Sequence, residues 1–383
     1  MTSVLIRAPL LTQSGYGVHS RQIFRWALEK GLDIKVQILP WGMTGWYTSS
    51  EECDGLIGEI MKRSSAPVRK PDLSLQVQLP NEWDPNIAEK NIGITAAVET
   101  TVCNRDWIQN CYAMDEVIVP SNFTKTVLIS SGHNSCNLHV VSESYYDSCG
   151  NTSSKENSQL KNIKTKHNFL LVGQITGNHL VDRKNIGNTI TAFMNHFKDR
   201  KDVGLIIKTN LGCNSSIDRH RTKKAIHEVV TATRTGDFPR VYLLHGRLTE
   251  SEMCDLYRNN TVTALISPTR GEGFGLPLLE ATACDLPVIA TNWSGHLDFL
   301  KDCDSFYPID YDIKTIPNPR VDNNIFVQGS KWAEPRMNSF CLQLDNVITD
   351  KKNRKKIDNS NIRSKFSFKA ISKQYDTVLG KYL

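Results

Sequence analysis

Short apolar runs alternate with longer amphipathic stretches along most of the chain. Runs of about four to eight apolar residues, bounded by Gly, Pro or polar residues, predict buried β-strands. In the first part of the chain these runs are residues 3–8, 32–39, 74–79, 91–98 and 115–120. In the second part they are residues 169–174, 203–210, 240–246, 261–267 and 286–291.

Helical periodicity fills the intervals between these strands. It is clearest at residues 18–31, 104–113 and 184–197, and Ser121 is a suitable cap for a further helix that begins there. Strands that alternate with helices are typical of parallel sheets built from βαβ units. Ligands bind such sheets beyond the carboxyl ends of the strands.

A polar segment divides the pattern in two. Residues 147–168 contain almost no large apolar side chains, which is typical of a linker or exposed loop. With 383 residues the chain is also longer than one compact core usually fills. We therefore predict an α/β protein with two Rossmann-like domains, whose parallel sheets face an interdomain cleft.

Composition and charge exclude few function classes. Hydrophobic residues make up 39% and charged residues 22%, as in ordinary soluble proteins, and the net charge is +6. Basic runs at 219–224 and 351–356 could attract phosphates or be solvated helix faces. No apolar stretch approaches a membrane span or a signal peptide, so we expect a cytoplasmic protein (host cytoplasm, if viral), peripheral to a membrane at most.

The ten cysteines form no CxxC pair. A zinc ribbon and a dithiol redox motif are therefore unsupported. Without an export signal, we expect reduced and mostly buried thiols.

The segment with the strongest chemical signal is "RGEGFGLPLLEATACDLPVIAT", residues 270–291. Gly273 and Gly275 allow a sharp bend, and Pro277 suits the first turn of a helix. The start of that helix presents free N–H groups and a partial positive charge, which suit phosphate or sugar hydroxyls. Glu272 and Glu280 are then placed to accept hydrogen bonds from two sets of hydroxyls.

This segment closely resembles the Glu-x7-Glu signature of GT-B retaining glycosyltransferases of family 4 (glycosyl transferases group 1). The resemblance extends upstream through "LLHGRLTESEMCDLYRNNTVTALISPTR" and includes "FLLVGQ" and "RKNIGNTITAF". It implies an acceptor-side domain at 1–160, a nucleotide-sugar donor domain at 161–355 and a C-terminal helix at 356–383 that crosses back to the first domain.

The resemblance also assigns roles to residues of the donor domain. Glu272 would bind the transferred sugar and Glu280 the ribose, while Lys184 would stabilise the departing diphosphate. Gln174 stands where the family has an arginine, and we infer that Arg183 supplies the missing charge. The remaining donor contacts implied are the backbone amides of Phe274, Gly275 and Leu276 and the nucleobase region at Arg247.

Candidates in the N-terminal part have weaker signals. By resemblance, Gly15 and Gly17 of "SGYGVHS" would approach the donor phosphate or the acceptor, although an ordinary strand–helix turn also explains them. Glu99, at a strand end, is a candidate acceptor contact. His19 is a second acceptor-side candidate, with a helix-surface histidine as the alternative.

We therefore expect an enzyme, a retaining hexosyl- or pentosyltransferase of class EC 2.4. It would move a sugar from a nucleotide-sugar co-substrate to a hydroxyl acceptor, a glycan or polysaccharide, without a cofactor. Two alternatives stay open: glycosylation of a hydroxymethylated base in viral DNA, and a catalytically silent scaffold. We expect no metal site, because "DCD" (302–304) and "DYD" (310–312) lack the context of a metal-dependent transferase.

Overall fold

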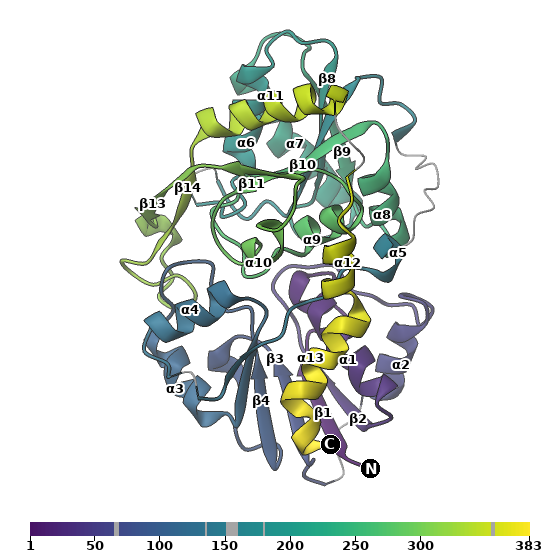
Figure 1. Ribbon diagram of the computed structural model, residues 1–383, viewed down its shortest axis with the longest axis vertical. Coiled ribbons are helices and arrows are strands. Elements are labelled where there is room, and N and C mark those ends of the chain that lie inside the picture. The colour runs from purple at the N-terminus through teal and green to yellow at the C-terminus, as the bar shows by residue number, and fades with distance from the viewer. Residues whose placement is uncertain (65–68, 135, 151–159, 179–180, 354–356) are drawn as a thin grey trace. The chain divides into compact units, whose positions relative to one another are not determined.

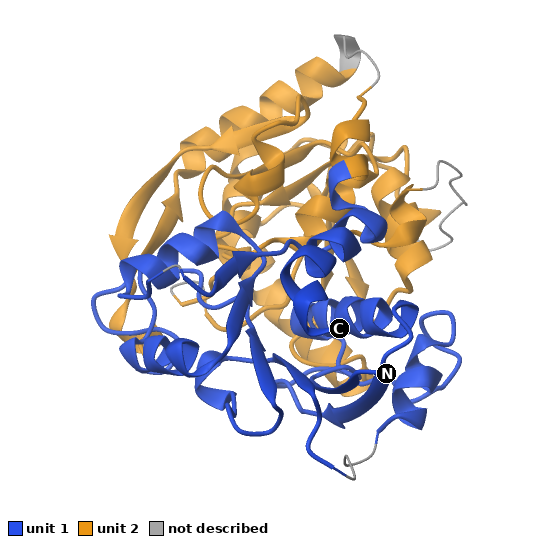
Figure 2. Cartoon of the chain, turned by 60° about the horizontal axis from the view of Figure 1, so that its bottom comes forward, with its two compact units in different colours: residues 1–144, 322–330, 365–383 blue, residues 145–321, 331–364 orange. Residues whose placement is uncertain are grey.

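The computed structural model describes residues 1–64, 69–134, 136–150, 160–178, 181–353 and 357–383. Its contacts divide the chain into two compact units, coloured separately in Figure 2. Each unit is discontinuous in sequence. Unit 1 comprises Met1–Ser144, Asp322–Ser330 and Lys365–Leu383, and unit 2 comprises Tyr145–Val321 and Lys331–Ser364.

Unit 1 is built on a parallel six-stranded sheet with helices packed around it (Figure 1). In sheet order the strands are β2 (Asp33–Ile38), β1 (Ser3–Ala8), β3 (Leu73–Val77), β4 (Lys90–Ile94), β5 (Glu116–Val119) and β6 (Leu138–Val140). The helices are α1 (Gly15–Glu29), α2 (Leu56–Lys62), α3 (Arg105–Ala113), α4 (Asn122–Ser130) and α13 (Phe368–Leu379), with short 3-10 turns at Pro80–Glu82 and Gly380–Tyr382.

The last helix, α13, packs within unit 1, although it ends the chain. Trp26 on α1 is buried, and its indole Nε1 donates a 2.9 Å hydrogen bond to Asp376 of α13. The rings of Trp26 and Tyr375 lie 5.6 Å apart. An aromatic contact and a partly buried hydrogen bond therefore join α13 to the first helix of the chain.

Unit 2 contains a second parallel six-stranded sheet and a separate antiparallel pair. In sheet order its strands are β12 (Phe306–Ile309), β11 (Val288–Thr291), β10 (Val262–Ser267), β7 (His167–Val172), β8 (Val203–Thr209) and β9 (Arg240–His245), and the pair is β13 (Tyr311–Thr315) with β14 (Lys331–Pro335). The helices are α5 (Asp147–Gly150), α6 (Ile186–His196), α7 (Ser216–Thr233), α8 (Glu250–Arg258), α9 (Leu276–Ala283), α10 (Leu297–Leu300), α11 (Met337–Asn353) and α12 (Ser360–Phe366), with a 3-10 turn at Asn318–Arg320. The last two residues of α12 belong to unit 1.

The core of unit 2 lies between its sheet and the helices α6 and α11. Phe169 of β7 packs against Phe193 of α6, with ring centroids 5.5 Å apart, and Phe340 of α11 joins the same buried cluster. Strands covered on both faces read as continuous apolar runs, which is the pattern seen in the sequence. Within the described part of the chain, no helix has the length and apolarity needed to cross a bilayer.

The strands predicted from apolar runs agree with the observed ones to within a few residues, and Ser121 does cap α4 by accepting from the Thr124 amide. The polar range 147–168 is only partly a loop, because α5 lies at its start and β7 begins at His167. Residues 151–159 of that range, and 354–356 of the second basic run, lie outside the described residues.

The expectation of reduced thiols throughout is wrong for one pair of cysteines. Cys149 of α5 and Cys254 of α8 form a disulfide, although they are 105 residues apart. Neither position belongs to a recognisable cysteine motif, so the pairing could not be predicted from the sequence. The bridge ties the start of unit 2 to a helix beside its central strands.

The two glycines at the start of α1 meet different surroundings. Ser14 caps the helix by accepting from the Gly17 amide, which brings that residue against the preceding turn. A Cβ on Gly17 would lie 2.1 Å from the Thr12 carbonyl oxygen, whereas a Cβ on Gly15 would meet nothing within 4 Å. Close backbone packing therefore requires glycine at position 17 and not at position 15.

We predict that Gly17→Ala lowers the free energy of unfolding by about 1–3 kcal/mol, because the turn must open to admit the methyl group. Gly15→Ala, the matched control, should change it by less than about 0.5 kcal/mol. Denaturant unfolding of both variants checks this. Equal effects of the two substitutions would contradict the packing explanation.

Candidate active site

The loop between β10 and α9 positions the residues with the strongest sequence signal. Strand β10 is buried throughout, and α9 begins directly after Gly275. Gly275 adopts φ +101°, a left-handed conformation that favours glycine, and a Cβ there would lie 3.0 Å from the Cβ of His296. The loop therefore turns sharply at the carboxyl end of the strand and presents the amino end of α9.

The Glu272 carboxylate lies at the centre of this loop and is only 4% exposed. Lys184 Nζ lies 2.6 and 2.7 Å from its two oxygens, and Arg183 Nη1 lies 3.2 Å from Oε2. Burial acts to raise the pKa of Glu272, but the charges of Lys184 and Arg183 outweigh it and lower the pKa to about 2. Glu272 is therefore a carboxylate at neutral pH.

The turn before α6 holds the two cations in place. Asp182 is buried and accepts hydrogen bonds from the Thr176 hydroxyl at 2.7 Å and from the Ile186 amide at 2.9 Å. The amide of Arg270 donates to the Arg183 carbonyl at 2.9 Å. This backbone bond connects the turn that carries the cations to the loop that carries Glu272.

The residues after β11 hold Glu272 from the other side. The Glu272 amide donates to the Ser294 hydroxyl at 2.9 Å, and the Glu272 carbonyl accepts from the Gly295 amide at 2.9 Å. His296 is fully buried, lies 2.7 Å from the Thr291 carbonyl through Nε2, and has a pKa lowered by burial. Sequence reasoning missed Ser294 and His296 as supports of the site.

Glu280 lies on α9 and is 4% exposed. It accepts a 3.0 Å hydrogen bond from the hydroxyl of Tyr257, which belongs to α8. Burial and the neighbouring Glu280 charge raise the pKa of Tyr257, so this hydroxyl keeps its proton and donates. Tyr257 was not a candidate from the sequence, where it stands alone in an amphipathic helix.

The other predicted donor-side residues lie around the same strand ends. Phe274 is buried against Phe299, with ring centroids 5.4 Å apart, and Leu276 begins α9. Arg247 is half-buried in the loop after β9. Gln174 follows β7 and donates to the Leu211 carbonyl at 3.3 Å.

A half-buried cation near Gln174 was not identified from the sequence. Lys208 pairs in register with Val172 at the end of β7, and its ammonium donates to the Gly246 carbonyl. Burial lowers the pKa of Lys208 to about 8. The sequence feature that could have identified Lys208 is its position as a charged residue in an otherwise apolar strand.

In unit 1 the predicted residues lie at the carboxyl ends of β1 and β4. Tyr16, next to Gly15, bonds with the Thr95 hydroxyl at 3.0 Å and stacks on Trp41 at 3.9 Å. Burial raises the pKa of Tyr16, and the charge of Glu99 adds to the shift. Glu99 itself is half-buried in the loop after β4.

His19 is not on the helix surface. It is 2% exposed, and Nε2 lies 2.9 Å from the Tyr375 hydroxyl. Nδ1 lies 3.8 Å from Glu143, whose Oε2 has no hydrogen-bond donor among the described residues. Burial lowers the pKa of His19 to about 4 and raises that of Glu143 to about 8, so both are uncharged near pH 6.

The structure thus brings Glu272, Lys184 and Arg183 together and places Glu280 in the helix that follows. The other donor-side candidates surround the same sheet edge, while Gly15, Gly17, His19 and Glu99 belong to unit 1. The aspartates of 302–304 and 310–312 are exposed, and Asp312 pairs with Arg336 at 2.5 Å. Among the described residues, the group of side chains that could hold a metal ion consists of Cys149, Cys254 and Cys284. It includes none of these aspartates.

Part of the chain matches a known protein family. Residues 155–309 match the family described as glycosyl transferases group 1. Over 94 residues the chain is 33% identical to sucrose-phosphate synthase 4 of Arabidopsis thaliana, a stretch that is 24% of this chain and 9% of the plant protein. The chain therefore spans only a small part of that relative.

Two solved structures share the whole fold. HepE of Anabaena, in complex with UDP and glucose, has a TM-score of 0.64 at 13% identity, with 100% of both chains covered. Sucrose-phosphate synthase of Thermosynechococcus elongatus has a TM-score of 0.66 at 12% identity, with 100% of this chain and 99% of that chain covered. Two parallel six-stranded sheets with this likeness confirm the predicted GT-B fold class. Residues 155–309 therefore resemble a glycosyltransferase domain, and the chain shares the fold of these two structures.

We predict that Lys184→Met destabilises the fold by about 1–3 kcal/mol, because the buried Glu272 carboxylate keeps Arg183 alone as its cation. The pKa of Glu272 should rise. In Lys184→Met/Glu272→Gln the loss should be smaller than the sum of the single losses. Chemical denaturation of the three variants measures the coupling, and simple additivity would contradict it.

The buried Glu143 predicts a pH dependence. Its folded pKa of about 8 lies above the unfolded value of 4.5, so its contribution is complete at low pH and is lost as the pH rises toward 8. Wild type should lose stability relative to Glu143→Gln between pH 5 and 8, by up to about 1.4 kcal/mol per pH unit. Urea unfolding at several pH values tests this, with the exposed Glu29→Gln as control. Parallel curves for wild type and Glu143→Gln would refute it.

Proposed function

We propose that the chain is a family 4 type transferase that moves a sugar from a UDP-sugar to a hydroxyl acceptor with retention at the anomeric carbon. The observation that supports it best is the buried Glu272 carboxylate, paired with Lys184 and Arg183 at the carboxyl ends of β7 and β10. UDP is the nucleotide we favour, because the similar HepE structures contain UDP or UDP-glucose.

The chemical difficulty of the reaction is the negative charge that develops on the departing diphosphate. Lys184 and Arg183 already lie at the donor end of unit 2, and the amino end of α9 adds N–H groups and a partial positive charge. Charges placed in advance where negative charge develops lower the barrier. These groups would act in place of a metal ion.

The two glutamates then have separate tasks. Glu272 remains ionised, so it can accept hydrogen bonds from hydroxyls of the transferred sugar. The diphosphate of the donor would interact with the same two cations as Glu272, namely Lys184 and Arg183. Glu280, oriented by Tyr257, would accept from the ribose hydroxyls, and the amides of Phe274, Gly275 and Leu276 and the loop at Arg247 would complete the donor contacts.

Unit 1 would bind the acceptor, which we propose to be a glycan. Its polar groups at the ends of β1 and β4 are the Tyr16 hydroxyl, Thr95 and Glu99, and they suit sugar hydroxyls. In family members, retention is attributed to attack on the front face, with the leaving phosphate accepting the acceptor's proton. We therefore assign no carboxylate as nucleophile.

Donor binding predicts thermal stabilisation of the native protein. UDP and UDP-glucose should raise the melting temperature more than the ADP-, GDP- or dTDP-sugars, since a ligand at 100 times its Kd stabilises by about 2.7 kcal/mol. Glu280→Gln should reduce the shift. No stabilisation by any nucleotide sugar would overturn the proposal.

Glu272→Gln should lower turnover at least about 100-fold, because an amide cannot replace the carboxylate in the transition state. Release of UDP from the responsive UDP-sugar measures it, first with water and then with glycan acceptors. Asp312→Asn, which removes an exposed carboxylate of the same unit, is the control. Equal turnover in Glu272→Gln and wild type would remove Glu272 from the reaction.

A further inference from the structure

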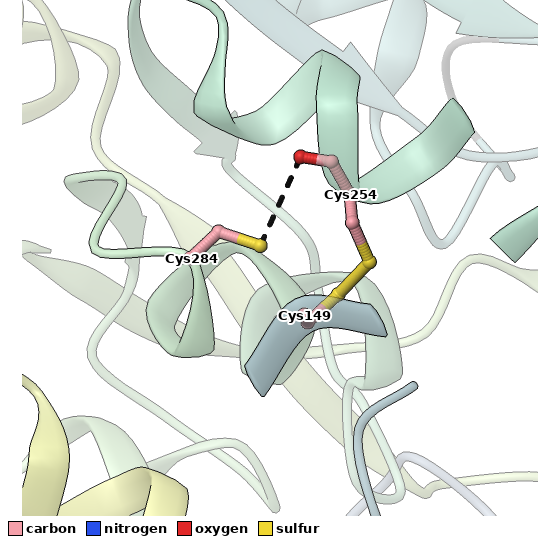
Figure 3. A group of neighbouring side chains, drawn as sticks. All are labelled: Cys149, Cys254 and Cys284. Atoms are coloured by element: carbon pink, nitrogen blue, oxygen red, sulfur yellow. Dashed lines mark hydrogen bonds between the residues drawn. A yellow bond between two sulfur atoms is a disulfide. The ribbon is translucent and has the colours of Figure 1, made fainter. Parts of the chain in front are cut away.

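Three cysteines of unit 2 lie close together where α5, α8 and α9 contact one another. Cys149 of α5 and Cys254 of α8 are bonded, and the sulfur of Cys284, at the end of α9, lies within 4.8 Å of both (Figure 3). The Cys284 thiol points toward the Cys254 carbonyl, 3.9 Å away. Three helices thus contribute one sulfur each to a single buried cluster.

Access from outside distinguishes the third cysteine from the bonded pair. Cys149 and Cys254 are each 1% exposed, whereas Cys284 is 8% exposed and lines a pocket of about 340 Å³. Arg258 and Lys351 also line that pocket, together with Asp285, whose carboxylate is paired with Arg363. The two cations favour a small anionic thiol, such as the tripeptide glutathione.

The cluster is connected to Glu280 by two short routes. Cys284 follows α9, and its amide donates to the Glu280 carbonyl at 3.1 Å. Cys254 lies one turn before Tyr257 on α8, and Tyr257 orients the Glu280 carboxylate. Any shift of α8 relative to α9 would therefore change the position of Glu280.

We propose that the Cys149–Cys254 disulfide is reversible, that Cys284 relays exchange between it and an anionic thiol in the pocket, and that the oxidised form favours nucleotide binding. The last part rests on the function proposed above. The oxidised bridge holds α8 to α5, and this keeps Tyr257 in place against Glu280. Reduction removes the covalent restraint and leaves the hydrogen bonds of Arg258 to the carbonyls of Ser148 and Cys149.

The exchange is balanced without any further reactant. Burial raises the pKa of the Cys284 thiol to about 12, so only a small fraction is ionised at neutral pH and the exchange is slow. That thiolate attacks Cys254, the Cys284–Cys254 bond forms, and Cys149 leaves with the electron pair and takes up the proton that Cys284 lost. A pocket thiolate then attacks Cys284 and releases Cys254 as a thiol. A second molecule of the pocket thiol frees Cys284, so the protein disulfide and two thiols become two protein thiols and one small-molecule disulfide.

The relay is tested by the rate of reduction. The oxidised full-length protein is incubated with reduced glutathione, and the Cys149 and Cys254 thiols are quantified by alkylation and mass spectrometry. Cys284→Ala should slow reduction at least about tenfold, because the buried bridge then lacks an accessible exchange partner. The control Cys303→Ala removes a free cysteine outside the cluster and should react as wild type does. Equal rates for wild type and Cys284→Ala would overturn the relay.

The coupling is tested by two measurements on oxidised and reduced protein. Amide hydrogen exchange in α8 should be faster after reduction, and the Kd for UDP should rise about fivefold. Cys149→Ala should show the weaker affinity regardless of redox state. A measurable Kd that is the same in both redox states would overturn the coupling, whether or not exchange in α8 changes. Absence of UDP binding in both states, with faster exchange in α8 after reduction, would instead overturn the proposed function.

The same three sulfurs could hold a soft metal ion when reduced. Protein purified without reductant or chelator distinguishes the two chemistries. We expect one disulfide per chain and less than stoichiometric zinc. One tightly bound zinc per chain, with Cys149, Cys254 and Cys284 all reduced, would overturn the disulfide relay.

Discussion

The buried carboxylate of Glu272 imposes the main constraint on unit 2. Removing a carboxylate from water favours its neutral form, so an ionised group at this depth requires cations at short distance. Lys184 and Arg183 supply them from a segment 88 residues away in sequence. The hydrogen bond from the Arg270 amide to the Arg183 carbonyl joins the two segments.

The proximity of Lys184 and Glu272 follows in part from the sheet. The family resemblance singled out both residues, and β7 and β10 are neighbouring parallel strands that end at the same edge. The left-handed conformation of Gly275 and the helix after it follow from residue type alone. The direct ion pair between Lys184 and Glu272 could not be predicted in this way, because it depends on the conformation of the turn at Asp182.

The residues that sequence analysis missed are those whose role depends on tertiary contacts. Glu143 stands in an unremarkable stretch, and only the packing of α1 and α13 around it removes it from water. For His19, the alternative of a helix-surface position was wrong. Helical periodicity cannot show that the final helix covers this face of α1. Tyr257 and Lys208 were missed for the same reason. Each side chain stands in a regular helix or strand, and its hydrogen-bond partner comes from a different part of the chain.

The bond between α5 and α8 makes a closed ring of the polypeptide between residues 149 and 254. That ring contains β7, β8 and β9, half of the sheet of unit 2, together with the turn that carries Lys184. A protease that cuts once inside it yields two pieces that still migrate as one on a non-reducing gel. One backbone break inside the ring therefore leaves both fragments covalently attached.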